Sequence, residues 1–198
     1  MTANDRMNLL LKKGAEPRPG LTGEEFRRIE ETYGVVFPQS LREFYETVLP
    51  VTGNPHEFPD WRDFSQENTT AVRERMKAPY VWLARDIDRG FRLPQWKGTA
   101  QEILRGAPVL IPVFGHRYMP VTGCSDPPVF STVGQDTVWY GSNLDDWLVH
   151  EFGERTASVN GAGLPYVPLW SDIMAYHAEE SERRMELLRQ MGLLPPQA

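Results

Sequence analysis

The sequence predicts an α+β protein with a single domain, in which a mostly antiparallel or mixed sheet packs against helices and a further helix is appended at the C-terminus. Apolar residues recur at helical spacing between residues 22 and 49 and again after residue 142, whereas residues 107–140 contain short apolar runs bounded by turn residues. Because the helical and extended patterns occupy separate blocks, they favour an α+β fold over an alternating α/β fold.

The first two predicted elements are helices. Residues 22–33 are expected to form the first, because Thr22 and Glu25 have the spacing of a capping box and Gly34 follows as a stop signal. The second helix is expected to begin at Pro38, since proline is favoured at the first helical position. Its core-facing stripe consists of Leu41, Phe44, Tyr45, Val48 and Leu49.

The middle of the chain carries weaker signals from the segment "TGNPHEFPDWRDF" onward. A short helix is expected near residues 70–77 and an extended piece near residues 80–84. Residues 86–98 are expected to be irregular, and a second short helix is expected over residues 99–105.

The second half of the chain predicts three strands. The run "APVLIPVF" (107–114) is continuously apolar and bounded by turn residues, which suits a buried strand. Residues 127–133 and 136–140 are expected to form two more strands, joined as a hairpin at Gly134–Gln135.

Two helices complete the predicted elements. Residues 142–152 begin with polar cap residues and an acidic first turn. Residues 153–169 are rich in glycine and proline and predict a long surface connection. The last helix lies in "SDIMAYHAEESERRMELLRQMG" and either docks on the domain or protrudes from it. Its thin apolar seam consists of Ile173, Met174, His177, Met185 and Leu188.

Composition and charge narrow the function classes. The chain has 198 residues and a net charge of −6, which argues against direct binding to nucleic acid, where lysine and arginine must neutralise phosphates. Its single cysteine, Cys124, excludes an intramolecular disulfide and suggests a reducing compartment, so we expect the protein in the cytoplasm. No apolar run is long enough to span a membrane, and the N-terminus does not resemble a signal peptide.

The sequence offers few catalytic candidates. His116 could act as a general base, but no nucleophile or metal-ligand spacing accompanies it, so a role at the end of a strand is the simpler interpretation. Cys124 and His150 could form a nucleophile–base pair, yet no third, orienting residue is evident. The His-Glu pairs at 56–57 and 150–151 lack the second histidine of a zinc motif, and there is no phosphate-binding loop. We therefore expect no catalysis, cofactor or metal.

Several segments resemble one family in their order and spacing. These are "LTGEEFRRIEETYGVVFPQSLREFY", "PDWRDF", "DIDRGFRLPQW", "APVLIPVFGHRYMP" and "PPVFSTVGQDTVWYGSNLDDWLVHEF". Together they resemble the SUKH superfamily of Smi/Knr-type domains, which includes bacterial toxin-immunity proteins and fungal regulators of cell-wall synthesis. The resemblance covers residues 21–153 and implies an N-terminal extension over 1–20. The connection and C-terminal helix over 154–198 lie outside it.

The resemblance implies a protein that works by binding. The leading expectation is an immunity protein that neutralises a cognate toxin domain by stoichiometric interaction, the toxin being basic and possessing nuclease or deaminase activity. An acidic protein would be steered toward such a partner by its charge. The alternative is a non-catalytic regulatory or scaffold module that binds a host protein. In either case the protein is expected to be a monomer or a weak homodimer.

Charge and expected exposure suggest which residues contact the partner. Aromatic and charged side chains supply much of the binding energy in interfaces. Trp61 could serve in this way or could instead pin its loop to the core, and the sequence leaves both open. His116 and Arg117 are expected mainly at a strand–turn junction, with a secondary part in partner contact. The candidate contact residues are Asp60, Trp61, Asp63, His116, Arg117, Asp136, Asp145 and Asp146.

Overall fold

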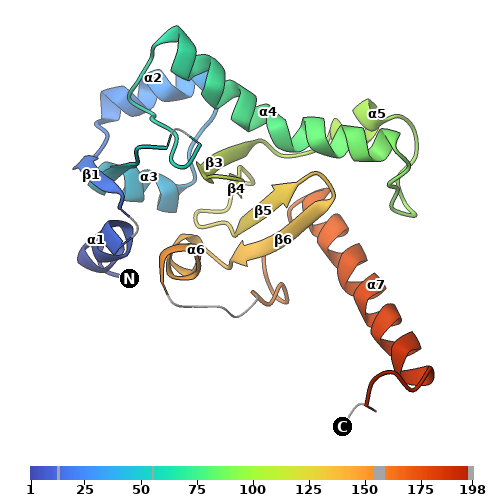
Figure 1. The fold of residues 1–198 in the computed structure, drawn as a ribbon. Helices are drawn as coiled ribbons and strands as arrows, with labels where there is room; N and C mark the ends of the chain where they lie inside the picture. The colour runs from blue at the N-terminus through green and yellow to red at the C-terminus, as the bar shows by residue number, and fades with distance from the viewer. Residues whose placement is uncertain (13, 55, 154–158, 196–198) are drawn as a thin grey trace.

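The computed structural model describes residues 1–12, 14–54, 56–153 and 159–195, and it confirms the predicted fold class (Figure 1). Antiparallel sheets pack against helices in one α+β domain, and a long helix follows at the C-terminus. The helices are α1 (Ala3–Lys12), α2 (Gly23–Tyr33), α3 (Gln39–Thr47), α4 (Gln66–Asp88), α5 (Ala100–Leu104), α6 (Leu144–Phe152) and α7 (Trp170–Gln190). The strands are β1 (Glu16–Pro19), β2 (Val48–Val51), β3 (Leu110–Phe114), β4 (Arg117–Pro120), β5 (Val129–Val133) and β6 (Asp136–Gly141).

The predicted start and end of α2 are confirmed in detail. The Thr22 side chain accepts a hydrogen bond from the Glu25 amide at 3.2 Å, and the Glu25 carboxylate accepts one from the Thr22 amide at 2.7 Å. Gly34 ends the helix in the left-handed conformation, with φ of 67°. The same capping box, formed by Thr99 and Glu102, begins α5 where a short helix was expected.

The second helix ends earlier than its apolar stripe predicts. α3 stops at Thr47, and Val48 and Leu49 belong to β2, which pairs antiparallel with β1. The reason is that Pro50 disfavours the helical conformation of the residue before it, while the strand at residues 16–19 offers backbone partners. Val48 and Leu49 are nevertheless buried, so the prediction that they belong to the core is correct although their predicted helical conformation is not.

The largest error in the predicted elements concerns α4. A short helix followed by an extended piece was expected, but residues 66–88 form one helix that contains Pro79. A proline cannot donate to the carbonyl four residues earlier, which here is that of Arg75. The Tyr118 hydroxyl donates to this carbonyl instead, at 3.2 Å. Tyr118 therefore supplies the donor that Pro79 lacks.

The four-stranded sheet has the order β3-β4-β5-β6, with every neighbouring pair antiparallel. The predicted hairpin at Gly134–Gln135 is confirmed, and Gly134 has φ of 65°. The buried hydroxyls of Thr132 and Thr137 are hydrogen-bonded to each other across this hairpin at 2.7 Å. β4 was expected only as a turn. Its pairing with β3 tolerates Pro112, because β3 is an edge strand.

The sheet separates two hydrophobic cores. Alternate residues of its strands point to opposite faces, so Ile111, Met119 and Val129 join one core and Leu110, Tyr118 and Phe130 join the other. The first core is closed by α1, α2, α3 and α6, and the second by α4, α5 and the start of α7. α4 contributes to both, since Val72 packs in the first core while Leu83 and Ile87 pack in the second.

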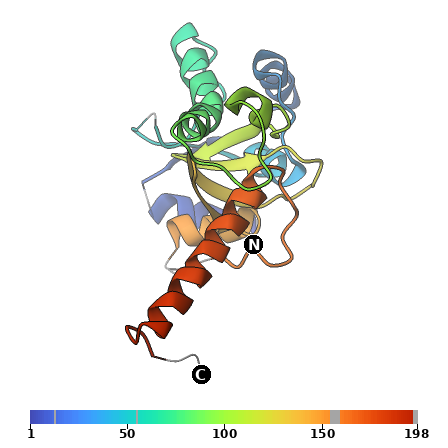
Figure 2. The same ribbon diagram turned by 90° about the vertical axis from the view of Figure 1, so that its right-hand side faces the viewer.

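The two ends of the chain differ in how they meet the domain. The N-terminal residues, expected as an extension, pack on it: Leu10 is fully buried, and Arg6 donates to Asp145 of α6 at 2.7 Å. At the other end only Trp170, Ile173 and Met174 of α7 are buried, and the rest of the helix projects from the body (Figures 1 and 2). The connection expected over residues 153–169 contains 154–158, which lie outside the described residues. Within the described ranges, no helix has the length and apolar character needed to cross a bilayer.

Candidate partner-binding groove

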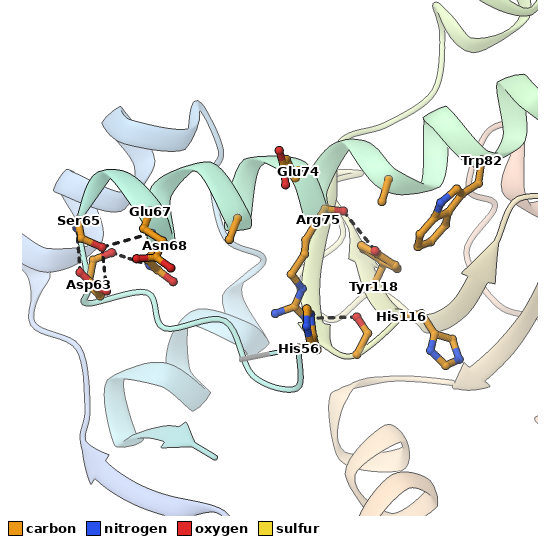
Figure 3. A pocket seen from close by; sticks show the side chains of 13 residues that line it. His56, Asp63, Ser65, Glu67, Asn68, Glu74, Arg75, Trp82, His116 and Tyr118 are labelled. Atoms are coloured by element: carbon orange, nitrogen blue, oxygen red, sulfur yellow. Dashed lines mark hydrogen bonds between the residues drawn. The ribbon is translucent and has the colours of Figure 1, made fainter. Parts of the chain in front are cut away.

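An open groove runs along α4 and past the turn between β3 and β4, with a volume of about 730 Å³ (Figure 3). Figure 3 shows Asp63 and Glu67 at one end, Trp82 and His116 at the other, and Arg75 between them. The full lining consists of His56, Asp63, Ser65, Glu67, Asn68, Ala71, Glu74, Arg75, Ala78, Trp82, Gly115, His116 and Tyr118.

One face of α4 forms the wall of the groove. Glu67, Ala71, Glu74, Ala78 and Trp82 are spaced by three or four residues and so lie on one side of the helix. The two alanines are short, which leaves the groove open between the longer side chains. The alternation of acidic, small and aromatic residues gives this wall polar contacts and an apolar anchor point.

The acidic end of the groove is held by the start of α4. Ser65 is the N-cap residue, and its hydroxyl accepts from the Asn68 amide at 3.2 Å. The Asp63 carboxylate accepts from the Ser65 amide at 2.8 Å, while the Asn68 side chain donates to the Asp63 carbonyl at 2.6 Å. These bonds fix Asp63 beside the positive end of the helix dipole, where a carboxylate is favoured.

The centre of the groove contains a cation, Arg75, for which the described residues supply no carboxylate partner. Nη2 of Arg75 donates to the carbonyls of Glu57 and Gly115, at 2.9 and 3.2 Å. Nη1 is buried and has no hydrogen-bond partner among the described residues. Burial lowers the pKa of the Arg75 guanidinium, although arginine stays charged at neutral pH. An unpaired charge at this depth is costly, so a bound acceptor would be stabilised here.

The other end of the groove is formed by Trp82 and His116. Trp82 is half-buried and offers part of its indole ring to solvent, and the His116 side chain is exposed on the β3–β4 turn. Burial lowers the pKa of His116, and the Arg117 charge lowers it further, against smaller opposing effects of Glu151 and Asp136. His116 is therefore mainly neutral at pH 7 and can both donate and accept hydrogen bonds.

Of the eight contact residues expected from the sequence, two line the groove, namely Asp63 and His116. Trp61 is fully buried and packs edge-on against Phe37, with ring centroids 5.2 Å apart. The expectation that this ring is exposed is therefore wrong, and the alternative of a core aromatic that pins the loop is the correct one. Asp136 is exposed on the β5–β6 hairpin, outside the groove lining.

Three of the remaining expected residues are engaged within the fold. Arg117 donates to Glu151 at 2.8 Å and to Ser131 at 2.7 Å. Asp145 accepts hydrogen bonds from the chain's amino group and from Arg6. Asp146 accepts hydrogen bonds from the amide and hydroxyl of Ser142. These side chains stabilise the β4–α6 region and the attachment of α1.

Asp60 also has internal partners, because it accepts from the Arg62 amide at 3.1 Å and lies 3.5 Å from the Arg18 guanidinium. The groove residues missed by the sequence include Arg75, Glu74 and Trp82. Their spacing of three or four residues could have placed them on one face of a helix. This spacing is informative only if residues 66–88 are treated as a single helix.

One of the residues considered for catalysis, His150, makes its contacts with Tyr140. Its Nδ1 donates a hydrogen bond to the Tyr140 carbonyl at 2.9 Å, and its ring stacks on that tyrosine ring. No group of three His, Cys, Asp or Glu side chains among the described residues is placed to hold a metal ion. Comparisons of the chain with known protein families, with curated proteins and with solved structures find no match.

Proposed function

We propose that this protein is a non-catalytic immunity protein that neutralises a cognate toxin domain by stoichiometric binding, and that the groove along α4 receives the toxin. The observation that carries the proposal is the composition of this groove. It has carboxylates at one end, a half-exposed tryptophan at the other, and between them the Arg75 guanidinium, whose Nη1 has no hydrogen-bond partner among the described residues. The resemblance of residues 21–153 to SUKH immunity proteins supports the same proposal.

The groove suits a protein segment of mixed charge. Asp63, Glu67 and Glu74 would receive basic side chains of the partner, and Arg75 would receive a carboxylate or a backbone carbonyl. Trp82 supplies the amphipathic surface from which interface hot spots are built. Because most of the lining belongs to α4 and to the β3–β4 hairpin, little ordering entropy is lost on binding.

The overall charge supports the choice of partner. A toxin that acts on nucleic acid needs a basic surface, and a net charge of −6 would speed its capture by this protein. Capture would take place in the cytoplasm of the producing cell, where the toxin would otherwise act. Whether the toxin is a nuclease or a deaminase is determined by assaying the purified toxin.

The test is a growth-rescue assay with matched variants. The toxin domain encoded beside this chain is expressed with and without the protein, and viable cells are counted. Wild-type protein should restore growth and co-purify with the toxin, whereas Trp82→Ser and Glu74→Arg should each weaken both effects. Glu179→Arg, a charge reversal on the exposed face of α7, serves as the control and should rescue fully.

Two outcomes separate the proposal from its alternative. Failure of wild-type protein to rescue, although both chains are expressed in soluble form, would argue for a regulatory scaffold, whose partner a pull-down from the host would then seek. Rescue that survives both groove substitutions would keep the immunity function but remove the groove as its docking surface.

A further inference from the structure

Among the described residues, the second half of α7 has no buried side chain. Trp170, Ile173 and Met174 anchor its first turns, and His177 hydrogen-bonds to the Gln135 carbonyl at 2.9 Å. Beyond this bond the helix continues for more than three turns away from the body (Figure 2). Isolated helices of this length are marginally stable in water, so a partner for its apolar face would be stabilising.

This projecting half carries a narrow apolar stripe. The stripe consists of Met185 and Leu188, which continue the face by which Met174 packs on the domain. The polar Ser181 lies on the same face between Met174 and Met185. The Met185 side chain is 40% exposed and lies in a shallow groove of about 410 Å³ with Glu182 and Arg189 at its edges. With Met185 at position a and Leu188 at position d of a heptad, the stripe has the spacing of a short coiled-coil seam.

We propose that two copies of this chain associate through antiparallel pairing of the projecting halves of α7, about a two-fold axis near residues 186 and 187. In this arrangement Met185 of each copy packs against Leu188 of the other. Glu182 of each copy then lies beside Arg189 of the second copy, which gives two symmetry-related ion pairs. The surface is self-complementary, as a two-fold dimer requires.

The charges on the helix exclude the parallel alternative. With Met185 at an a position, Arg184 occupies position g and Arg189 occupies position e. In a parallel pair, position g of one helix faces position e of the other, so Arg184 would face Arg189 of the second copy. A parallel dimer would therefore place two arginines against each other on both sides of the seam. Like charges at these positions are repulsive, whereas the antiparallel pairing replaces them with Glu182–Arg189 contacts.

Charge also selects the register of the antiparallel pair. Sliding the helices by one heptad would centre the axis near residue 183, so that Met185 would meet Ser181 of the second copy. Glu182 would then face Glu182 and Arg184 would face Arg184 across the axis. The proposed register avoids both contacts and brings the apolar residues Met185 and Leu188 together.

The expected dimer is weak, because two helical turns from each copy form a small interface. It should therefore be measured over a wide range of concentrations, from about 1 µM to about 1 mM of the full-length chain. Sedimentation equilibrium should show a reversible monomer–dimer transition in this range. A monomer at every concentration would overturn the proposal.

A charge-swap experiment tests the register. Glu182→Arg and Arg189→Glu should each weaken dimerisation by at least about tenfold, because each creates two like-charge contacts in the proposed register. The double variant restores opposite charges and should recover most of the wild-type association. A dimer that is insensitive to both single changes, or a double variant as weak as either, would refute the proposed pairing.

Two controls keep the result unambiguous. Glu179→Arg changes the charge on the opposite face of the same helix and should leave the dimer unchanged. The helical content of every variant should match the wild type by circular dichroism, since these side chains are exposed or half-exposed on the projecting part of α7. The inference does not depend on the proposed immunity function, and it can be tested without a toxin.

Discussion

The hydrogen bond between Tyr118 and the Arg75 carbonyl leads to a quantitative prediction. Pro79 leaves that carbonyl without its helical donor, and the Tyr118 hydroxyl occupies the place, at 3.2 Å. The Tyr118 ring is buried with 1% of its surface exposed, and burial raises the pKa of its hydroxyl to about 12. The hydroxyl therefore stays protonated, and able to donate, at neutral pH.

We expect Tyr118→Phe to lower the free energy of unfolding by about 1–3 kcal/mol, the cost of leaving a poorly solvated carbonyl without a donor. The ring itself is retained, so the packing of the second core is preserved. In a Pro79→Ala background the residue at 79 has an N–H that can bond to the Arg75 carbonyl. The same Tyr118→Phe change should then cost about 1 kcal/mol less.

The assay is equilibrium unfolding in urea, followed by the fluorescence of the six tryptophans, for the wild type, both single variants and the double variant. The coupling energy from this cycle removes the separate effects of proline on the unfolded chain. Tyr80→Phe is the control, because the Tyr80 hydroxyl donates to the Pro108 carbonyl, which Pro79 does not affect. Equal costs of Tyr118→Phe in both backgrounds would refute the account of Pro79.

Three further predictions concern stability. Arg117→Met should lower the free energy of unfolding by about 3–5 kcal/mol in the same urea assay, because it leaves a nearly buried carboxylate unpaired; a loss below about 1 kcal/mol would contradict this. The Arg62 guanidinium and the Thr22 amide lower the pKa of Glu25 to about 2, so stability from this group is full above pH 4.5 and is lost as the pH falls toward 2. Arg62→Met should reduce that dependence on pH, and unchanged acid unfolding would argue against the pair. Gly141→Ala should lower the melting temperature, because a Cβ atom would lie 2.5 Å from the backbone nitrogen of Trp147; an unchanged thermal midpoint would show that the chain shifts easily there.

Local signals in the sequence were sufficient for some elements. α2 could be placed because its capping box uses side chains only three residues apart in the sequence. α5 was expected as a short helix, but its capping box was recognised only in the structure. The hairpin at Gly134–Gln135 was equally local. The α+β class followed from the order of such signals along the chain.

Other elements depend on contacts that are distant in sequence. α4 continues through Pro79 because Tyr118, 39 residues later on β4, supplies a hydrogen-bond donor. β2 replaces the last turn of α3 because residues 16–19 pair with it. The groove runs along α4 from Glu67 to Trp82, across Pro79, so the errors at Pro79 and at the groove share one cause. Trp61 was ambiguous because a buried and an exposed tryptophan look the same in sequence.

The position of α4 across both cores has a consequence for motion. Its N-terminal half is held by the first core and its C-terminal half by the second, with Pro79 near the boundary. A proline inside a helix is a common place for bending. A segment bound along the groove would contact Asp63 on one side of this boundary and Trp82 on the other. It would therefore restrict bending of α4 at Pro79. Amide hydrogen exchange should then slow in both halves of the domain, including in residues that the bound segment never touches.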